Sequence, residues 1–173
     1  MMIYLKCTGD VQKAIGLRKE NLADALPSEA PLGNWYVHRF NLTRGQAYIF
    51  MSEATLLSFI LFQGKKPVTA ESLPGMLTAG LSQLLEMRGL PAPAIRRAIE
   101  PFSNGLYART NSRSDLGSLN DLILHYQWAI ERDGGLARCD LTRIIMKLNE
   151  MPQRRLKWAT SWDMTQSVLS LKI

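Results

Sequence analysis

Residues 35–62, WYVHRFNLTRGQAYIFMSEATLLSFILF, decide the fold. From Trp35 to Leu42, two sets of side chains alternate with the period of two that is typical of a β-strand. A turn at residues 43–46 leads to a returning strand from Ala47 to Met51, and a third strand runs from about Thr55 to Phe62. The connections are too short for a parallel crossover, so we expect three consecutive antiparallel strands.

The pattern on either side of this stretch is partly extended and mostly helical. Upstream, the apolar run from Ile3 to Cys7 predicts another strand, a short helix begins at about Gly9, and two prolines and a glycine make residues 26–34 a loop. Downstream, we predict a strand and four helices: helix Glu71–Arg88, helix Pro91–Phe102, strand Leu106–Arg109, helix Ser118–Arg132 and helix Asp140–Glu150. Strands followed by helices predict an α+β fold, with helices packed on one face of a mostly antiparallel sheet of about four to five strands.

Length and composition indicate one globular domain over residues 1–173. The chain is 46% hydrophobic and 21% charged, as is usual for globular proteins. The pattern weakens in the tail from about residue 152, where a last helix from Trp162 to Leu171 is the only element suggested. The longest apolar run, Leu56 to Phe62, is much shorter than the roughly 20 residues that span a bilayer, so we expect no membrane association.

Cysteine and histidine usage argues against a cofactor or metal site. The two cysteines, Cys7 and Cys139, lie far apart, and with only two histidines a Cys/His zinc site is not expected. The N-terminal apolar run is too short for a signal peptide, and two cysteines suit a reducing compartment, so we expect a cytoplasmic protein.

The net charge of +6 permits an acidic partner such as nucleic acid but does not require one. Lysines and arginines are spread along the chain, which is more typical of a solvated surface than of a binding stripe. Near Arg154, Arg155 and Lys157, however, Trp158 and Trp162 make a basic and aromatic mixture that would stack on bases or anchor the tail. The partner, protein or nucleic acid, and the oligomeric state stay open.

The polar segment from Thr110 to Asp121, TNSRSDLGSLND, is the best-marked candidate site. Ser118 suits a helix N-cap, Asp121 three residues later would complete a capping box, and Gly117 would allow a sharp turn before the helix. Free N–H groups there, together with Arg113, would bind phosphate or carboxylate, while the alternative is a helix cap and a hydrogen-bonded loop. The candidate binding residues are Arg109, Asn111, Ser112, Ser114, Ser118 and Asn120.

The same segment resembles the hallmark of a bacterial family catalogued as a domain of unknown function, whose members carry an Asn-Arg-Ser-x-Leu-Gly-Ser-Met-Asn-Asp-type motif. Here Ser112 precedes Arg113, which departs from the usual order. The resemblance extends from residue 2 to about residue 150 and includes residues 2–8, 32–36, 49–56 and 134–136. It implies a fold but no activity.

One face of the predicted helix from Ser118 carries a second candidate site. Asp121, His125, Trp128 and Arg132 share this face, where Asp121 would orient His125 as a general base. With Arg113 as the group that stabilises phosphate charge, His125 and Asp121 complete a candidate catalytic set. The ordinary alternative is a surface Asp–His pair beside a half-buried tryptophan. His38 is expected to be a packed, hydrogen-bonded histidine.

Three functions compete. The first is a small bacterial binding or regulatory module, by association with mobile-element, toxin–antitoxin or phage-defence systems. The second is a phosphodiester-cleaving enzyme, such as a ribonuclease toxin, that uses His125, Asp121 and either Arg109 or Arg113. The third is a homo-oligomeric structural protein that pairs through the exposed edge of its strand meander.

Overall fold

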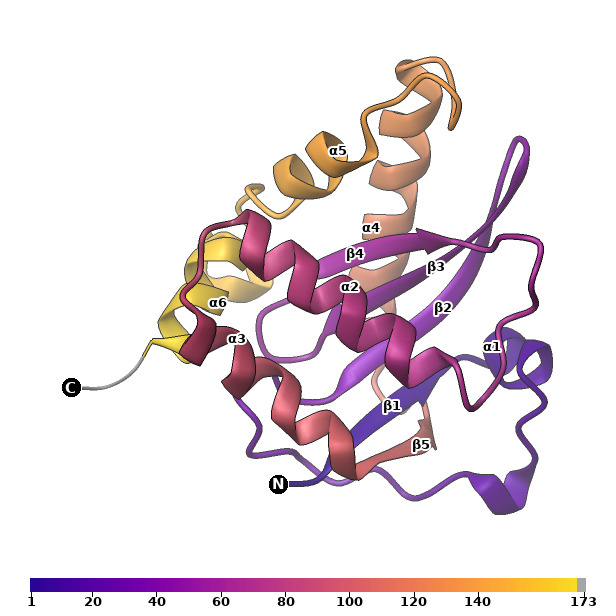
Figure 1. Ribbon diagram of the computed structural model, residues 1–173, viewed down its shortest axis with the longest axis vertical. Coiled ribbons are helices and arrows are strands. Elements are labelled where there is room, and N and C mark those ends of the chain that lie inside the picture. The colour runs from indigo at the N-terminus through magenta and orange to yellow at the C-terminus, as the bar shows by residue number, and fades with distance from the viewer. Residues whose placement is uncertain (171–173) are drawn as a thin grey trace.

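A computed structural model describes residues 1–170 and contains a five-stranded sheet with strand order β4-β3-β2-β1-β5 (Figure 1). The predicted Leu171 end of the last helix lies outside these residues. The elements in chain order are β1 (Ile3–Cys7), α1 (Gly9–Ala14), η1 (Lys19–Asn21), β2 (Trp35–Leu42), β3 (Gly45–Ser52), β4 (Ser58–Phe62), α2 (Leu73–Met87), α3 (Ala92–Ile99), η2 (Glu100–Asn104), β5 (Gly105–Arg109), α4 (Arg113–Arg132), α5 (Leu141–Leu148), η3 (Arg154–Leu156) and α6 (Ser161–Leu169).

The antiparallel meander predicted from residues 35–62 is confirmed. β2 pairs antiparallel with β3 along its whole length, from Trp35 opposite Ser52 to Leu42 opposite Gly45, and β3 pairs antiparallel with β4. β4 begins at Ser58, later than expected, because Leu56 adopts a left-handed conformation with φ 57°. Thr55 is held in this turn by a hydrogen bond from its backbone N–H to the Ser52 hydroxyl at 3.1 Å.

The α+β class is confirmed, but the sheet is mixed. β1 lies between β2 and β5 and is parallel to both, with Leu5 opposite Trp35 on one side and Tyr107 on the other. The outer edge of β5 is partly covered, because Ala23 forms a parallel bridge with Ala108. Both parallel pairings join segments that are distant in sequence, and no local pattern predicts them.

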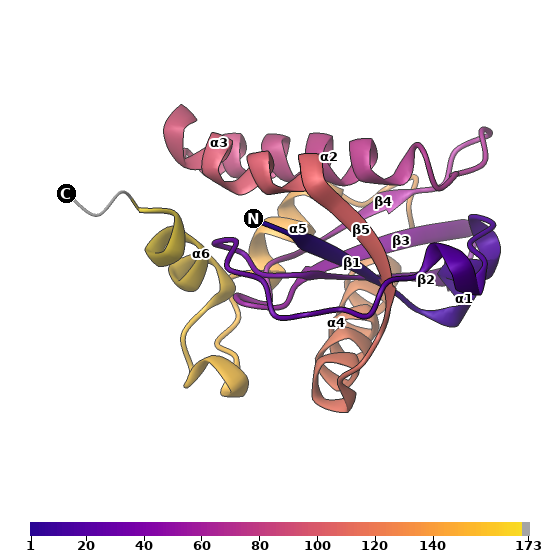
Figure 2. The same cartoon turned by 90° about the horizontal axis from the view of Figure 1, so that it is seen from below.

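Helices cover both faces of the sheet, not one face as the sequence suggested. Figure 2 shows α2 and α3 on one side of the sheet and α4 on the opposite side. On the α2–α3 side, the Trp35 ring lies 6.1 Å from the rings of both Phe59 and Phe102. On the α4 side, the Tyr126 hydroxyl lies 2.9 Å from the Ser58 hydroxyl. This two-sided cover explains why consecutive residues at the start of β2 are all buried.

α4 begins earlier than predicted. Its N-cap is Ser112, whose hydroxyl accepts the backbone N–H of Asp115 at 3.2 Å. Ser118 and Gly117 are therefore inside the helix, and the predicted cap at Ser118, capping box with Asp121 and sharp turn at Gly117 are wrong. The apolar face of α4 is buried and consists of Leu119, Leu122, Ile123, Tyr126 and Ile130.

The C-terminal segment packs on the rest of the chain through Trp162. This residue is 0% exposed in α6, and its indole N–H donates to the Met146 carbonyl oxygen at 3.1 Å. Trp162 therefore anchors the tail, while Trp158 is 67% exposed.

Candidate functional site

One face of α4 carries a row of polar and aromatic side chains at alternating spacings of four and three residues, which is the repeat of a single helix face. We call this row the α4 stripe; it consists of Ser114, Ser118, Asp121, His125, Trp128 and Arg132. At 1.5 Å per residue the stripe extends roughly 27 Å. Each half of the stripe lines a pocket.

The N-terminal half of the stripe lines a pocket of about 450 Å³. Its other wall is the segment Met151–Arg155, which follows α5. Ser114 and Ser118 line this pocket together with Asp121 and His125, so the two candidate sites predicted separately from the sequence share one pocket.

Arg155 fixes the wall of this pocket to the start of α4. One guanidinium nitrogen donates to the Ser118 hydroxyl at 2.9 Å and to the Ser114 carbonyl oxygen at 3.2 Å. The other donates to Asp115 Oδ1 at 2.6 Å, and the Asp115 side chain is only 6% exposed. This ion pair was not predicted from the sequence. The only indication near Asp115 in the sequence is that this aspartate follows a serine by three residues. The same pattern recurs at Ser118 and Asp121, so it does not single out Asp115.

The C-terminal half of the stripe lines a second pocket, of about 330 Å³, between α4 and α5. Trp128 is 62% exposed there, and the Arg132 guanidinium lies over its ring, 5.1 Å from the centroid. Arg143 and Lys147 of α5 line the same pocket, and Asp133 is the acidic residue among its lining. An aromatic face surrounded by cations suits a ligand that is both planar and anionic.

His125 and Asp121 are both exposed and line one pocket. Within residues 1–170, the two side chains form neither a hydrogen bond nor an ion pair with each other. His125 and Asp121 thus share one face of α4, but this structure contains no contact between them that orients the histidine ring.

Asn111 and Ser112 lie on the other side of Asp115, in a third pocket of about 450 Å³ that Lys6 and Glu53 also line. The Tyr36 hydroxyl donates to Asn111 Oδ1 at 3.2 Å, and the nearly buried Lys6 ammonium pairs with Glu53 at 2.6 Å. Burial, reinforced by the negative charges of Asp115 and Glu53, raises the pKa of Tyr36 well above its usual range. Tyr36 is therefore a neutral hydrogen-bond donor.

The predicted site residues thus divide among several places. Ser114, Ser118, Asp121 and His125 meet in one pocket, while Asn111 and Ser112 lie in another. The remaining three, Arg109, Arg113 and Asn120, are exposed and line neither pocket. His38 is packed as expected, with its Nδ1 2.6 Å from the Thr8 hydroxyl.

Over residues 1–170, no group of three or more His, Cys, Asp or Glu side chains is arranged to hold a metal ion. Nor does any helix in that range combine the length and apolar character that crossing a membrane requires.

Comparison with known proteins gives one family. Residues 4–164 match the family described as "Domain of unknown function (DUF6933)". No curated protein matches the chain.

Proposed function

The chain belongs to the DUF6933 family, whose description assigns no activity, and we propose from its site that it is a module that binds single-stranded nucleic acid along the α4 stripe. The observation that carries the proposal is Trp128, which is 62% exposed and surrounded by Arg132, Arg143 and Lys147. Exposed tryptophans stack on unpaired bases, and neighbouring cations neutralise phosphates.

The arrangement favours a single strand over a duplex. In a duplex the base faces are already stacked on one another, so an indole gains little unless a base is unpaired. Trp128 is paired with Arg132 on its ring, which adds cation–π attraction to any stack. At the other end of the stripe, Arg154 lines the pocket with Ser118 and takes part in none of the ion pairs within residues 1–170, so its guanidinium can contact a phosphate backbone.

Fluorescence anisotropy of a labelled single-stranded RNA and a single-stranded DNA tests the proposal. We expect Kd to rise with salt, because phosphate contacts release counterions, and Trp128→Ala to weaken binding about tenfold. Leu124→Ala is the matched control, because Leu124 is 64% exposed on the same helix but lies outside the stripe. Equal affinities for the wild type and Trp128→Ala, or no binding at low salt, would refute the proposal.

A second candidate function is phosphodiester cleavage, favoured by the presence of His125 in the same pocket as Arg154 and Arg155. His125 would act as the general base with Asp121 as its orienting group. The stabilising cation would be Arg109 or Arg113, as proposed from the sequence, or Arg154 in the pocket itself. The test is incubation of labelled RNA with the wild type, His125→Ala and the exposed control Leu124→Ala. Cleavage that survives in His125→Ala excludes this role for the histidine.

The biological setting is also a proposal. Cys7 and Cys139 are both free thiols, which supports a location in the cytoplasm, where thiols stay reduced. A regulatory or accessory role in a bacterial mobile-element, toxin–antitoxin or phage-defence system rests on the size and class of the chain alone.

A further inference from the structure

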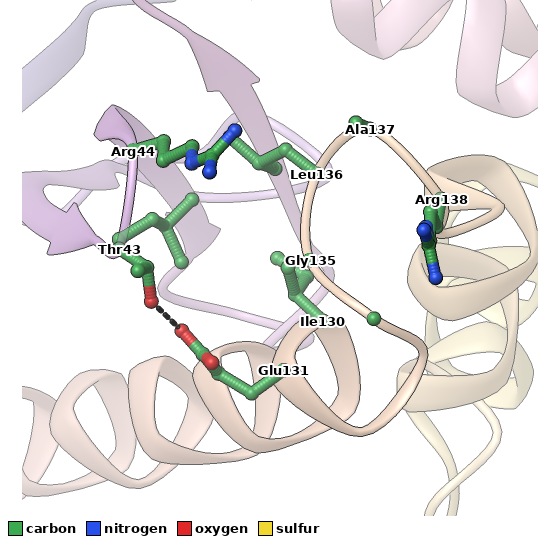
Figure 3. Close-up of a pocket in the computed structure, with 10 residues that line it drawn as sticks. Thr43, Arg44, Ile130, Glu131, Gly135, Leu136, Ala137 and Arg138 are labelled. Atoms are coloured by element: carbon green, nitrogen blue, oxygen red, sulfur yellow. Dashed lines mark hydrogen bonds between the residues drawn. The ribbon is translucent and has the colours of Figure 1, made fainter.

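A pocket of about 760 Å³ lies away from the α4 stripe. It is formed by the turn between β2 and β3 and by the loop that follows α4, at residues 134–138. Arg44 and Arg138 both line this pocket, and Figure 3 shows them on opposite sides of the loop. The apolar part of the lining comes from Leu42, Ile130 and Leu136.

The two arginines are available to a ligand. Both are exposed, and none of the ion pairs within residues 1–170 involves either of them. The Arg138 side chain packs closely on Gly134, because a Cβ atom at Gly134 would lie 3.1 Å from Arg138 Cδ. Gly134 also has φ +93°, a backbone conformation that residues with a side chain rarely adopt. The loop therefore depends on glycine at the point where the Arg138 side chain packs.

Backbone donors add to the positive character of this loop. Two consecutive residues with positive φ, Gly134 and Gly135, turn the chain after α4. The following N–H groups, of Leu136 and Ala137, donate to no acceptor within residues 1–170. Free N–H groups in such a turn are favourable partners for an anion.

The opposite side of the pocket has a different chemistry. Figure 3 shows Glu131 bonded to Thr43, away from Leu136 and the Arg138 side chain. This hydrogen bond, together with the one from the Gln127 side chain to the Asn41 carbonyl oxygen at 3.0 Å, fastens the β2–β3 turn to α4. The remaining acceptor capacity of the Glu131 carboxylate suits a ligand hydroxyl or amine.

We propose that this pocket binds a small organic phosphate monoester, with its phosphate between Arg44 and Arg138 and a hydroxyl- or amino-bearing body toward Glu131. A phosphate monoester carries about −1.5 to −2 charges near pH 7 and three acceptor oxygens, which matches two guanidinium groups and the free N–H groups. A single carboxylate would leave one guanidinium uncompensated. The apolar lining would contact the ring of the ligand. This site is independent of the nucleic-acid proposal, because it shares no residue with the α4 stripe.

Isothermal titration calorimetry with AMP as the probe tests this inference. We expect AMP to bind, inorganic phosphate to bind more weakly, and adenosine not to bind. Arg44→Gln and Arg138→Gln should each weaken AMP binding at least tenfold, and Arg138→Lys should recover only part of it, since lysine lacks the guanidinium fork. Arg96→Gln, which changes an exposed arginine on α3, should leave AMP affinity unchanged.

Four results would overturn the inference: no heat of binding with millimolar AMP, equal binding of AMP and adenosine, AMP binding that survives both arginine substitutions, or succinate binding as tightly as AMP. The last result would assign the pocket to dicarboxylates instead. Circular dichroism of each variant shows whether it is folded, and a loss of AMP binding counts only in a folded variant. The surface position of both arginines makes folded variants the expected outcome.

Discussion

The side-chain amide of Asn149 hydrogen-bonds to both backbone groups of Ser58, accepting from its N–H at 2.9 Å and donating to its carbonyl oxygen at 2.8 Å. β4, which begins at Ser58, is an edge strand of the sheet. The amide therefore takes the place of a neighbouring strand at that point, which opposes pairing with a second copy through this part of the meander. Asn149 is 1% exposed, so water does not substitute for it.

We predict that Asn149→Ala lowers the free energy of unfolding by about 2 kcal/mol, because the buried Ser58 N–H loses its acceptor and the Ser58 carbonyl oxygen keeps only the Tyr126 hydroxyl, at 3.2 Å. Urea denaturation followed by circular dichroism measures this change. Asn120→Ala is the control, since Asn120 is exposed, and its effect should stay within about 0.5 kcal/mol. A change in Asn149→Ala no larger than in the control would show that the edge is satisfied without the amide.

Two glycine-to-alanine substitutions in helices should have opposite signs. At Gly80 of α2 a Cβ atom would lie 2.6 Å from Phe59 Cε2, whereas at Gly117 of α4 nothing lies within 4 Å. We expect Gly117→Ala to stabilise the protein by about 0.5–1 kcal/mol through helix propensity, and Gly80→Ala to destabilise it by about 1–3 kcal/mol through overpacking. Thermal and urea unfolding compare the two. Destabilisation by Gly117→Ala would contradict the position of this glycine inside a helix.

The Arg155–Asp115 ion pair should be detectable by a double-mutant cycle. Arg155→Ala leaves the Asp115 carboxylate, 6% exposed, without its guanidinium partner. We expect a loss of about 1–2 kcal/mol, below the range for fully buried pairs because the Arg155 side chain is 39% exposed. Asp115→Asn in the same background should recover part of it. Additive effects of the two substitutions would show that the pair does not couple.

Stability should fall below neutral pH partly through His38. Burial lowers the pKa of His38 below its usual value near 6.5, opposed by the negative charge of Asp10. The folded state therefore favours the neutral ring, and its contribution is complete above the unfolded pKa and is lost as pH falls below it. Between pH 7.5 and pH 5.5, we expect the urea concentration at the unfolding midpoint to fall less in His38→Gln than in the wild type. An equal or larger drop in His38→Gln would contradict this account.

Much of the sheet could be predicted because its signals are local. The alternation from Trp35 to Leu42 and the short turn at residues 43–46 predict the β2–β3 pairing without any distant information. The parallel pairing of β1 with β5 joins residues about 100 positions apart, such as Ile3 and Gly105, and nothing in either strand identifies its partner. The mixed sheet follows from that pairing and from the parallel pairing of β1 with β2.

The start of α4 shows how local signals can mislead. Ser112 is followed three residues later by Asp115, and Ser118 is followed three residues later by Asp121, so both serines fit the same capping pattern. Gly117 favours the later start when only local preferences are considered. The structure uses the earlier one, where Asp115 is held by Arg155 and Leu119 is buried. A contact with the tail therefore decides a choice that the segment itself leaves open.

The site was harder to predict than the fold. The helical spacing of Asp121, His125, Trp128 and Arg132 identified one shared face, which the structure places along two pockets. The opposite walls, formed by α5 and by residues 151–155, come from segments that are separate in sequence. Nothing in the sequence indicated the pocket that Arg44 and Arg138 line, because these two arginines are isolated residues in different turns.

The position of β1 in the sheet sets the order in which the strands can pair while the chain is synthesised on the ribosome. The antiparallel hairpins of residues 35–62 can form as soon as those residues have emerged, because all of their pairings are between neighbours. β1 emerges before these hairpins, but its pairing with β5 waits until residue 109 has been made. β1 is thus among the last strands to gain its full set of sheet contacts, and a nascent chain arrested before that point would carry an unfinished sheet edge.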